Sequence, residues 1–121
     1  MNDQILWVVV IVVFVAFVLL RMRGSISADK ARQLLSEGGV VVDVRTREEF
    51  ASHRLKKAVN IPLAELGQRI RETVPDKSVP VLVHCASGAR SAAAVGQLRR
   101  LGYERAYNIG SFHKAKSIVG S

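Results

Sequence analysis

Cysteine and histidine are scarce in this sequence. It has one cysteine, Cys85, and three histidines, His53, His84 and His113, which are spread along the chain. A structural zinc site usually takes four cysteine or histidine ligands, so the sequence does not support a metal site. Internal repeats and low-complexity tracts are also absent. The 121 residues leave room for one domain of about 100 residues and one additional element.

Acidic residues are also in the minority: 10 Asp and Glu stand against 18 Lys and Arg, and the formal net charge is +8. An excess of this kind is compatible with nucleic-acid binding, but no aromatic residues alternate with the basic ones and no recognition motif accompanies them. We therefore expect no nucleic-acid partner. The basic residues are better interpreted as a solvated face that also lies near anionic lipid headgroups. They gather in two groups, Arg54, Lys56 and Lys57, and Arg99, Arg100 and Arg105.

One long apolar run is present, from Ile5 to Leu20. As a helix its 16 residues span about 24 Å, slightly less than a bilayer core of about 30 Å. The long side chains of Arg21 and Arg23 can reach the headgroups and close this difference. A domain of this size has no interior that could surround a helix that is apolar on every side. We therefore expect a transmembrane anchor in residues 1–23, followed by one domain in residues 24–121.

A cleaved secretory signal is the competing interpretation of the apolar run. It is disfavoured because the first four residues carry no basic residue and no small-x-small cleavage site follows Leu20. All 18 Lys and Arg lie at or beyond position 21, against nine acidic residues there, since Asp3 is the tenth. The positive-inside rule then predicts a single-pass protein of a bacterial-type inner membrane, with its soluble domain in the cytoplasm. Reductants of the cytosol would keep Cys85 free.

The pattern after residue 24 predicts an α/β domain. Apolar stretches rich in valine alternate with segments of helical pattern, which favours a parallel sheet with helices on both faces. Continuous runs of valine, rather than an alternation of apolar and polar residues, are typical of strands buried on both sides. We expect strands near residue 26 and at 40–44, 59–61, 79–84 and 105–109, and helices at 28–37, 47–52, 63–73 and 89–101.

The segment from Val81 to Ser91 carries the clearest sign of chemistry. An apolar strand ends at Cys85, a loop of small residues follows, and a helix is expected to begin near Ala89. Free N–H groups at a helix start favour a thiolate, which is the nucleophilic form of cysteine. Small side chains let successive amides form a concave nest for an anion or a sulfur atom, and Arg90 adds positive charge. The predicted site is Cys85 with the loop residues Ala86, Ser87, Gly88, Ala89, Arg90 and Ser91.

Asp43 and Arg45 follow a neighbouring strand and are predicted to lie at the same sheet edge as Cys85. They are supporting residues: Asp43 could orient Arg90 or accept loop amides, and Arg45 could contribute to the anion field. A salt bridge that merely fixes the loop is an equally good interpretation of this pair. His84 precedes Cys85 on the strand and points to the opposite face, so it is more readily a core histidine than a base for the thiol.

Three ordered motifs resemble the rhodanese-like (sulfurtransferase) family. They are Cys85-x-x-Gly88-x-Arg90-Ser91, the stretch Val41-Val-Asp-Val-Arg45 with Glu49-Phe50, and Ala58-Val-Asn-Ile-Pro62. The resemblance covers residues 25–109. The sequence departs from the family at His53-Arg-Leu-Lys-Lys-Ala58, which lacks the usual turn glycine and proline, and in a tail shortened to Gly110-Ser111-Phe112. The resemblance implies a rhodanese-like parallel sheet, here preceded by one transmembrane helix.

The activity implied by the resemblance is sulfur transfer by double displacement. The Cys85 thiolate would take the outer sulfur of a small anionic donor, such as thiosulfate or a persulfide, and the loop amides would hold the resulting cysteine persulfide. Cyanide or a cellular thiol would then accept the sulfur. The family's reaction needs no cofactor.

Two other functions remain open. Cysteine phosphatases use a similar strand, loop and arginine, but they place five residues between Cys and Arg, whereas four separate Cys85 from Arg90. The smaller ring suits a sulfur atom better than a phosphate. The second alternative is a membrane-tethered, non-catalytic interaction module, because rhodanese-like domains also serve as docking units.

Overall fold

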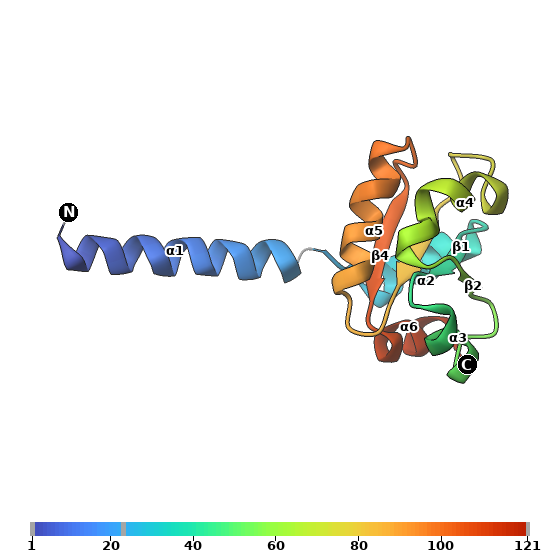
Figure 1. Ribbon diagram of the computed structural model, residues 1–121, viewed down its shortest axis with the longest axis horizontal. Helices are drawn as coiled ribbons and strands as arrows, with labels where there is room; N and C mark the ends of the chain where they lie inside the picture. Colours follow the sequence, from blue (N-terminus) through green and yellow to red (C-terminus); the bar gives the residue numbers. More distant parts are fainter. Residues whose placement is uncertain (1, 23, 121) are drawn as a thin grey trace.

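The computed structural model describes residues 2–22 and 24–120. Figure 1 shows the elements from α2 onward packed around one sheet. The predicted boundary between anchor and domain falls on Arg23, which lies outside the described residues. The side chain of Arg21 is likewise outside the described part of the structure. The elements are α1 (Asp3–Met22), α2 (Ala28–Ser36), β1 (Val40–Asp43), α3 (Arg47–Ser52), β2 (Val59–Asn60), the 3-10 helix η1 (Leu63–Glu65), α4 (Leu66–Thr73), β3 (Val81–His84), α5 (Ala89–Arg100), β4 (Ala106–Gly110) and α6 (Phe112–Val119).

The four strands form a parallel sheet in the order β2-β1-β3-β4. The register pairs Asp43 of β1 with Asn60 of β2 and with His84 of β3. A register shift in β4 then pairs His84 with Gly110. The carboxyl ends of all four strands therefore meet at one edge, where ligands bind in sheets of this kind.

The sheet is buried on both faces, which explains the valine-rich strands. Alternate residues of β1 and β3 face opposite ways: Val42 and Val83 pack in one core, and Val41 and Leu82 in the other. Helices α4 and α5 close the first core through Ile70 and Leu98, among others. Helices α2 and α6 close the second core. The predicted α/β class, with helices on both faces of a parallel sheet, is confirmed.

Most expected elements are present, with three differences. The strand expected near Ile26 is only an isolated bridge between Ser25 and Asn108. The helix expected at 63–73 begins as the 3-10 turn η1 before α4. Helix α6 was not expected; Ser111 begins it by accepting a hydrogen bond from the backbone N–H of Lys114 at 3.1 Å.

In residues 53–58, where the sequence departs from the family, the chain turns without the usual glycine and proline. Lys56 and Lys57 form a turn, and the N–H of Ala58 donates to the carbonyl of Leu55 at 3.2 Å. The Leu55 side chain is buried in the core beneath α2 and α6. Burial of this one leucine anchors the loop in place of the missing turn residues.

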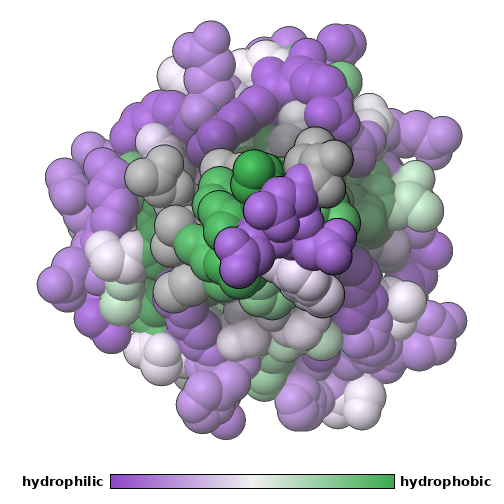
Figure 2. Space-filling model, turned by 90° about the vertical axis from the view of Figure 1, so that its left-hand side faces the viewer, coloured by the Kyte–Doolittle hydropathy of each residue, from purple (hydrophilic) through white to green (hydrophobic). Residues whose placement is uncertain are grey.

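Helix α1 extends away from the domain (Figure 1) and leaves large apolar side chains exposed, including Trp7 and Phe14 at 66% and 65%. Figure 2, in which α1 points toward the viewer, shows apolar surface gathered at the centre, partly behind a hydrophilic group and surrounded by hydrophilic surface. Among the residues that the structure describes, no helix combines the length and the apolar character needed to cross a membrane.

Candidate functional site

The sulfur of Cys85 lies at the end of the central strand β3, inside the loop that leads to α5. Val81 to Val83 are buried in the sheet, so the chain is fixed up to the cysteine, which is itself inaccessible to solvent. The loop can turn sharply because Gly88 adopts φ +101°, a left-handed conformation that other residues rarely take. Helix α5 then begins at Ala89, and the N–H of Ser91 in its first turn points back at the sulfur.

Two backbone N–H groups and one hydroxyl converge on the Cys85 Sγ atom. The backbone N–H of Gly88 donates at 3.0 Å and that of Ser91 at 3.4 Å, and the Ser91 Oγ lies 3.4 Å away. Burial alone would raise the pKa of the Cys85 thiol, but hydrogen bonds from Ser91, Gly88 and Ser87 outweigh it and hold this pKa below its ordinary value. The loop therefore favours the thiolate, and the same donors are suited to a negatively charged sulfur.

Arg90 pairs with Glu49, a residue that the sequence motifs do not assign to the site. Its guanidinium forms a two-pronged ion pair with Glu49, with Nη1–Oε1 and Nη2–Oε2 distances of 2.6 and 2.9 Å. The hydrogen bonds from Arg90 lower the pKa of Glu49 to about 2. Glu49 also caps α3 reciprocally with Thr46. The Thr-x-x-Glu spacing of this capping box could have identified the glutamate as a fixed residue.

Asp43 and Arg45 pair with each other at the adjacent strand end. Arg45 Nη2 lies 2.7 Å from Asp43 Oδ2, and the Arg45 N–H donates to Asp43 Oδ1 at 2.9 Å. Arg45 also donates to the carbonyl of His53 at 2.6 Å and lies over the Phe112 ring, 4.7 Å from its centre. The pair is buried and fixes the loop at residue 53, whereas the partner of Arg90 is Glu49 and not Asp43.

His84 is buried on the sheet face opposite Cys85. Its Nδ1 lies 3.4 Å from the Cys85 carbonyl oxygen, and its Nε2 is 3.7 Å from Asp43 Oδ2. This Nε2 is buried and has no hydrogen-bond partner among the described residues. Burial lowers the pKa of His84, against the opposite effect of the Asp43 carboxylate. The ring therefore has no route to the sulfur as a base.

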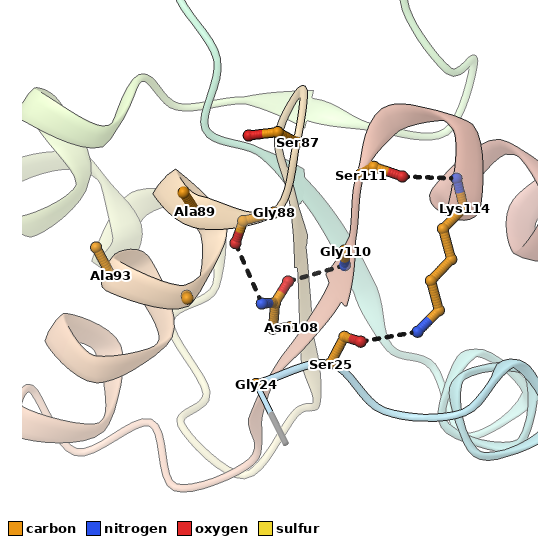
Figure 3. Close-up of a pocket in the computed structure, with 11 residues that line it drawn as sticks. Gly24, Ser25, Ser87, Gly88, Ala89, Ala93, Asn108, Gly110, Ser111 and Lys114 are labelled. Carbon is orange, nitrogen blue, oxygen red and sulfur yellow. Dashed lines mark hydrogen bonds between the residues drawn. The ribbon is translucent and has the colours of Figure 1, made fainter. Parts of the chain in front are cut away.

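A cavity of about 620 Å³ lies beside the loop (Figure 3). Its walls come from the loop, from the first turns of α5, from the segment after α1, from the end of β4 and from α6. On one side Lys114 Nζ donates to Ser25 Oγ at 3.0 Å and to the Ile26 carbonyl at 2.6 Å. Asn108 forms the floor between Gly88 and Gly110. The residues described in the structure include no cluster of three or more histidine, cysteine or carboxylate side chains that could hold a metal ion.

Several known proteins are similar to this chain. A family profile described as a rhodanese-like domain matches residues 27–117. Thiosulfate sulfurtransferase PspE of Escherichia coli is 39% identical over 69 residues, a match that covers 57% of this chain and 66% of that protein. Thiosulfate sulfurtransferase 18 of Arabidopsis thaliana is 34% identical over 103 residues, a match that covers 75% of this chain and 76% of that protein. The structure of the human single-domain sulfurtransferase TSTD1 is 28% identical, with a TM-score of 0.64 over 78% of this chain and 96% of that one.

Proposed function

Because this chain belongs to the rhodanese-like domain family, we propose that it is a sulfurtransferase that carries sulfane sulfur on Cys85. The observation that carries the proposal is the convergence of the Gly88 and Ser91 amides on the Cys85 Sγ atom, at 3.0 and 3.4 Å. Donors aimed at a sulfur that carries negative charge suit both the attacking thiolate and the persulfide that follows. The names of the E. coli, Arabidopsis and human proteins support the same reaction class.

The reaction has two displacement steps. In the first, the Cys85 thiolate attacks the outer sulfur of thiosulfate, a new S–S bond forms, and sulfite leaves with the electron pair of the old one. In the second, an acceptor thiolate or cyanide attacks the outer sulfur of the Cys85 persulfide. This releases a persulfide or thiocyanate and restores the Cys85 thiolate. No redox partner is needed, because each step exchanges one sulfur bond for another.

The fixed amides of Gly88 and Ser91 would stabilise the negative charge of the Cys85 thiolate, which is present before the first step and again after the second. In the persulfide the negative charge lies on the outer sulfur, one bond further into the loop. Arg90 is held by Glu49 at the rim of the loop and makes no direct bond to the sulfur, and the two opposite charges largely offset each other. A small anionic donor suits the loop amides and the net charge of +8.

Cyanide-dependent formation of thiocyanate from thiosulfate tests the proposal. Cys85→Ser should abolish turnover. A second variant, C85S combined with S117C, restores one thiol at the exposed position 117 of α6, outside the loop, and should also be inactive, because the loop amides are missing there. Undiminished turnover in C85S would rule the proposal out. An inactive native protein whose Cys85 also gains no sulfur would favour the non-catalytic interaction module.

We further propose that residues 1–23, with the apolar run from Ile5 to Leu20, anchor the chain in a bacterial-type inner membrane, with the domain on the cytoplasmic side. The support is the unbroken apolar sequence, the exposure of side chains such as Trp7 and Phe14 on a helix that leaves the domain, and the excess of basic residues after it. Exposed apolar surface costs about 25 cal/mol per Å² in water. In cells, the full chain should sediment with membranes and resist extraction at high salt; recovery in the soluble fraction would contradict the anchor.

A further inference from the structure

Residues 53–58, which we call the basic loop, join α3 to β2 and carry three positive charges. Arg54, Lys56 and Lys57 are exposed, and none of them forms an ion pair with a residue that the structure describes. The two lysines form a turn that one backbone hydrogen bond closes, and no residue of the basic loop has a positive φ. Many other residue types could form such a turn, so the fold does not call for lysine here.

The basic loop is fixed at the strand ends. The buried side chain of Leu55 anchors its middle, and the carbonyl of His53 accepts a hydrogen bond from Arg45 at 2.6 Å. The His53 ring also packs on Phe112, with the ring centres 4.4 Å apart. Because Arg45 follows β1 and Phe112 begins α6, the basic loop borders the sheet edge that carries Cys85. Its charges therefore have a defined place beside the site.

The carboxylates around the basic loop do not offset its charge. Glu49 of α3 is paired with Arg90, and Glu65 of η1 is paired with Arg47. Glu48 is the one acidic residue of α3 that forms no ion pair among the described residues. Against three positive charges, this one carboxylate leaves the surface around the basic loop with a surplus of positive charge.

The basic loop lies at the end of the domain farthest from α1. In Figure 1 it is the green segment between α3 and β2, whereas α1 leaves the domain from the opposite end. With α1 in a membrane, the domain would stand between this loop and the lipid headgroups. The potential of a lipid surface falls off within a Debye length, about 8 Å at physiological ionic strength. Lipid headgroups at α1 therefore do not account for these charges, although the sequence alone favoured them as neighbours.

We propose that the basic loop is the docking site for the acidic face of a protein whose cysteine thiol accepts the sulfur from Cys85. The proposal rests on the proposed function for the sulfur that is passed on. Acidic side chains of the partner pair with the three basic ones, and apolar side chains meet two neighbours of the loop. These are the Phe50 ring, over which Arg54 lies at 5.1 Å, and Val59, which is 38% exposed.

Docking brings the partner's thiolate to the sheet edge where the sulfur is held. The thiolate attacks the outer sulfur of the Cys85 persulfide and forms a new S–S bond with it. The bond between the two sulfurs of the persulfide breaks, and its electron pair restores the Cys85 thiolate. Charges spread along a loop suit a protein surface because they select the partner and speed its association.

The test follows sulfur transfer from the full-length protein, in a neutral detergent, to short synthetic peptides with one cysteine. The cysteine is flanked by Glu and Asp in the acidic peptide and by Gln and Asn in the neutral one. In Lys56→Gln combined with Lys57→Gln, we expect KM for the acidic peptide to rise about fivefold, because two exposed charge pairs are lost. KM for the neutral peptide should not change.

The matched control removes two charges from the opposite edge of the sheet. Arg71 and Arg100 are exposed near the ends of α4 and α5, helices that run back from the strand ends. R71Q combined with R100Q lowers the net charge as much as K56Q with K57Q, but it should leave KM for both peptides near the native value. The two double variants should form thiocyanate at the same rate, because cyanide does not use the basic loop.

Fluorescence anisotropy of a labelled acidic peptide, with serine in place of its cysteine, measures docking without sulfur transfer. K56Q with K57Q should weaken this binding, and R71Q with R100Q should not. If this result is found but no sulfur moves, the docking site stands and the proposed function fails.

The proposal would be overturned if K56Q with K57Q left both KM and peptide binding at their native values, or if the two double variants lost them equally. It would also be overturned if K56Q with K57Q weakened binding to vesicles that contain phosphatidylglycerol and left peptide binding unchanged. The basic loop would then serve a lipid surface and not an acidic protein.

Discussion

Gly88 sets the direction of the amide that lies closest to the sulfur. Its φ of +101° requires a left-handed residue, although an added Cβ would find room, with its nearest neighbour at 3.7 Å. The penalty for a side chain there is therefore conformational and not steric, about 1–2 kcal/mol. The N–H that donates to Cys85 Sγ at 3.0 Å would move with the backbone.

Gly88→Ala should therefore lower the free energy of unfolding by about 1–2 kcal/mol and slow alkylation of Cys85. The matched control is Gly96→Ala, in the middle of α5, where the added Cβ makes an ordinary contact 3.7 Å from an Arg100 nitrogen. This control should stabilise the protein by up to about 1 kcal/mol. Urea unfolding measures both, and equal effects of the two changes would refute the special role of Gly88.

The Glu49–Arg90 pair makes stability depend on pH. The pKa of Glu49 is held at about 2, below its ordinary value of 4.5. A carboxyl group with a lowered pKa stabilises the folded state above its unfolded value, and this contribution disappears as pH falls through the folded value. Both side chains are about one-third exposed, so the contribution is about 1 kcal/mol or less.

In Glu49→Gln, the free energy of unfolding should be slightly lower than in the native protein at pH 7. Glutamine can still cap α3 with Thr46, so the change isolates the charge. The difference between the two proteins should shrink as pH falls from 4.5 toward 2. A difference that stays constant over this range, measured by urea unfolding, would show that the Glu49 charge is not responsible.

Helix α6 closes the second core and also covers the strand ends. Its first residue, Phe112, lies 4.4 Å from the His53 ring and 4.7 Å from the Arg45 guanidinium, measured to ring centres. Phe112→Ala should therefore destabilise the protein by about 2 kcal/mol, less than for a fully buried phenylalanine. It should also loosen the loop at residues 53–58. Unchanged stability in urea would show that this stack contributes nothing.

Sequence patterns predicted the strands, the helices around them and the loop from Cys85 to Ser91, because each depends on local periodicity and spacing. The resemblance to the rhodanese-like family is confirmed by the match to residues 27–117. Helix α6 was missed although Ser111 is a good cap and apolar residues follow at helical spacing. Glu49 and Asn108 could not be assigned to the site in the same way, because their partners, Arg90 and Ser91, are distant in sequence and meet them only in the folded sheet.

At the scale of the whole molecule, the net charge of +8 should affect the capture of an anionic donor. We expect kcat/KM for thiosulfate to fall several-fold between low and high ionic strength, where salt screens the field of the domain. The value of kcat should change little, because the amides around Cys85 are buried and poorly screened. A kcat/KM that does not depend on salt would mean that net charge plays no part in donor binding.

The proposed function requires Cys85 to receive a sulfur atom and to pass it on. Mass spectrometry of the intact reduced protein after incubation with thiosulfate tests it most directly. We expect the mass to rise by one sulfur atom, located at Cys85 by peptide mapping, and to return to its original value when cyanide is added. A mass that never changes, or an added sulfur that cyanide does not remove, would contradict the account.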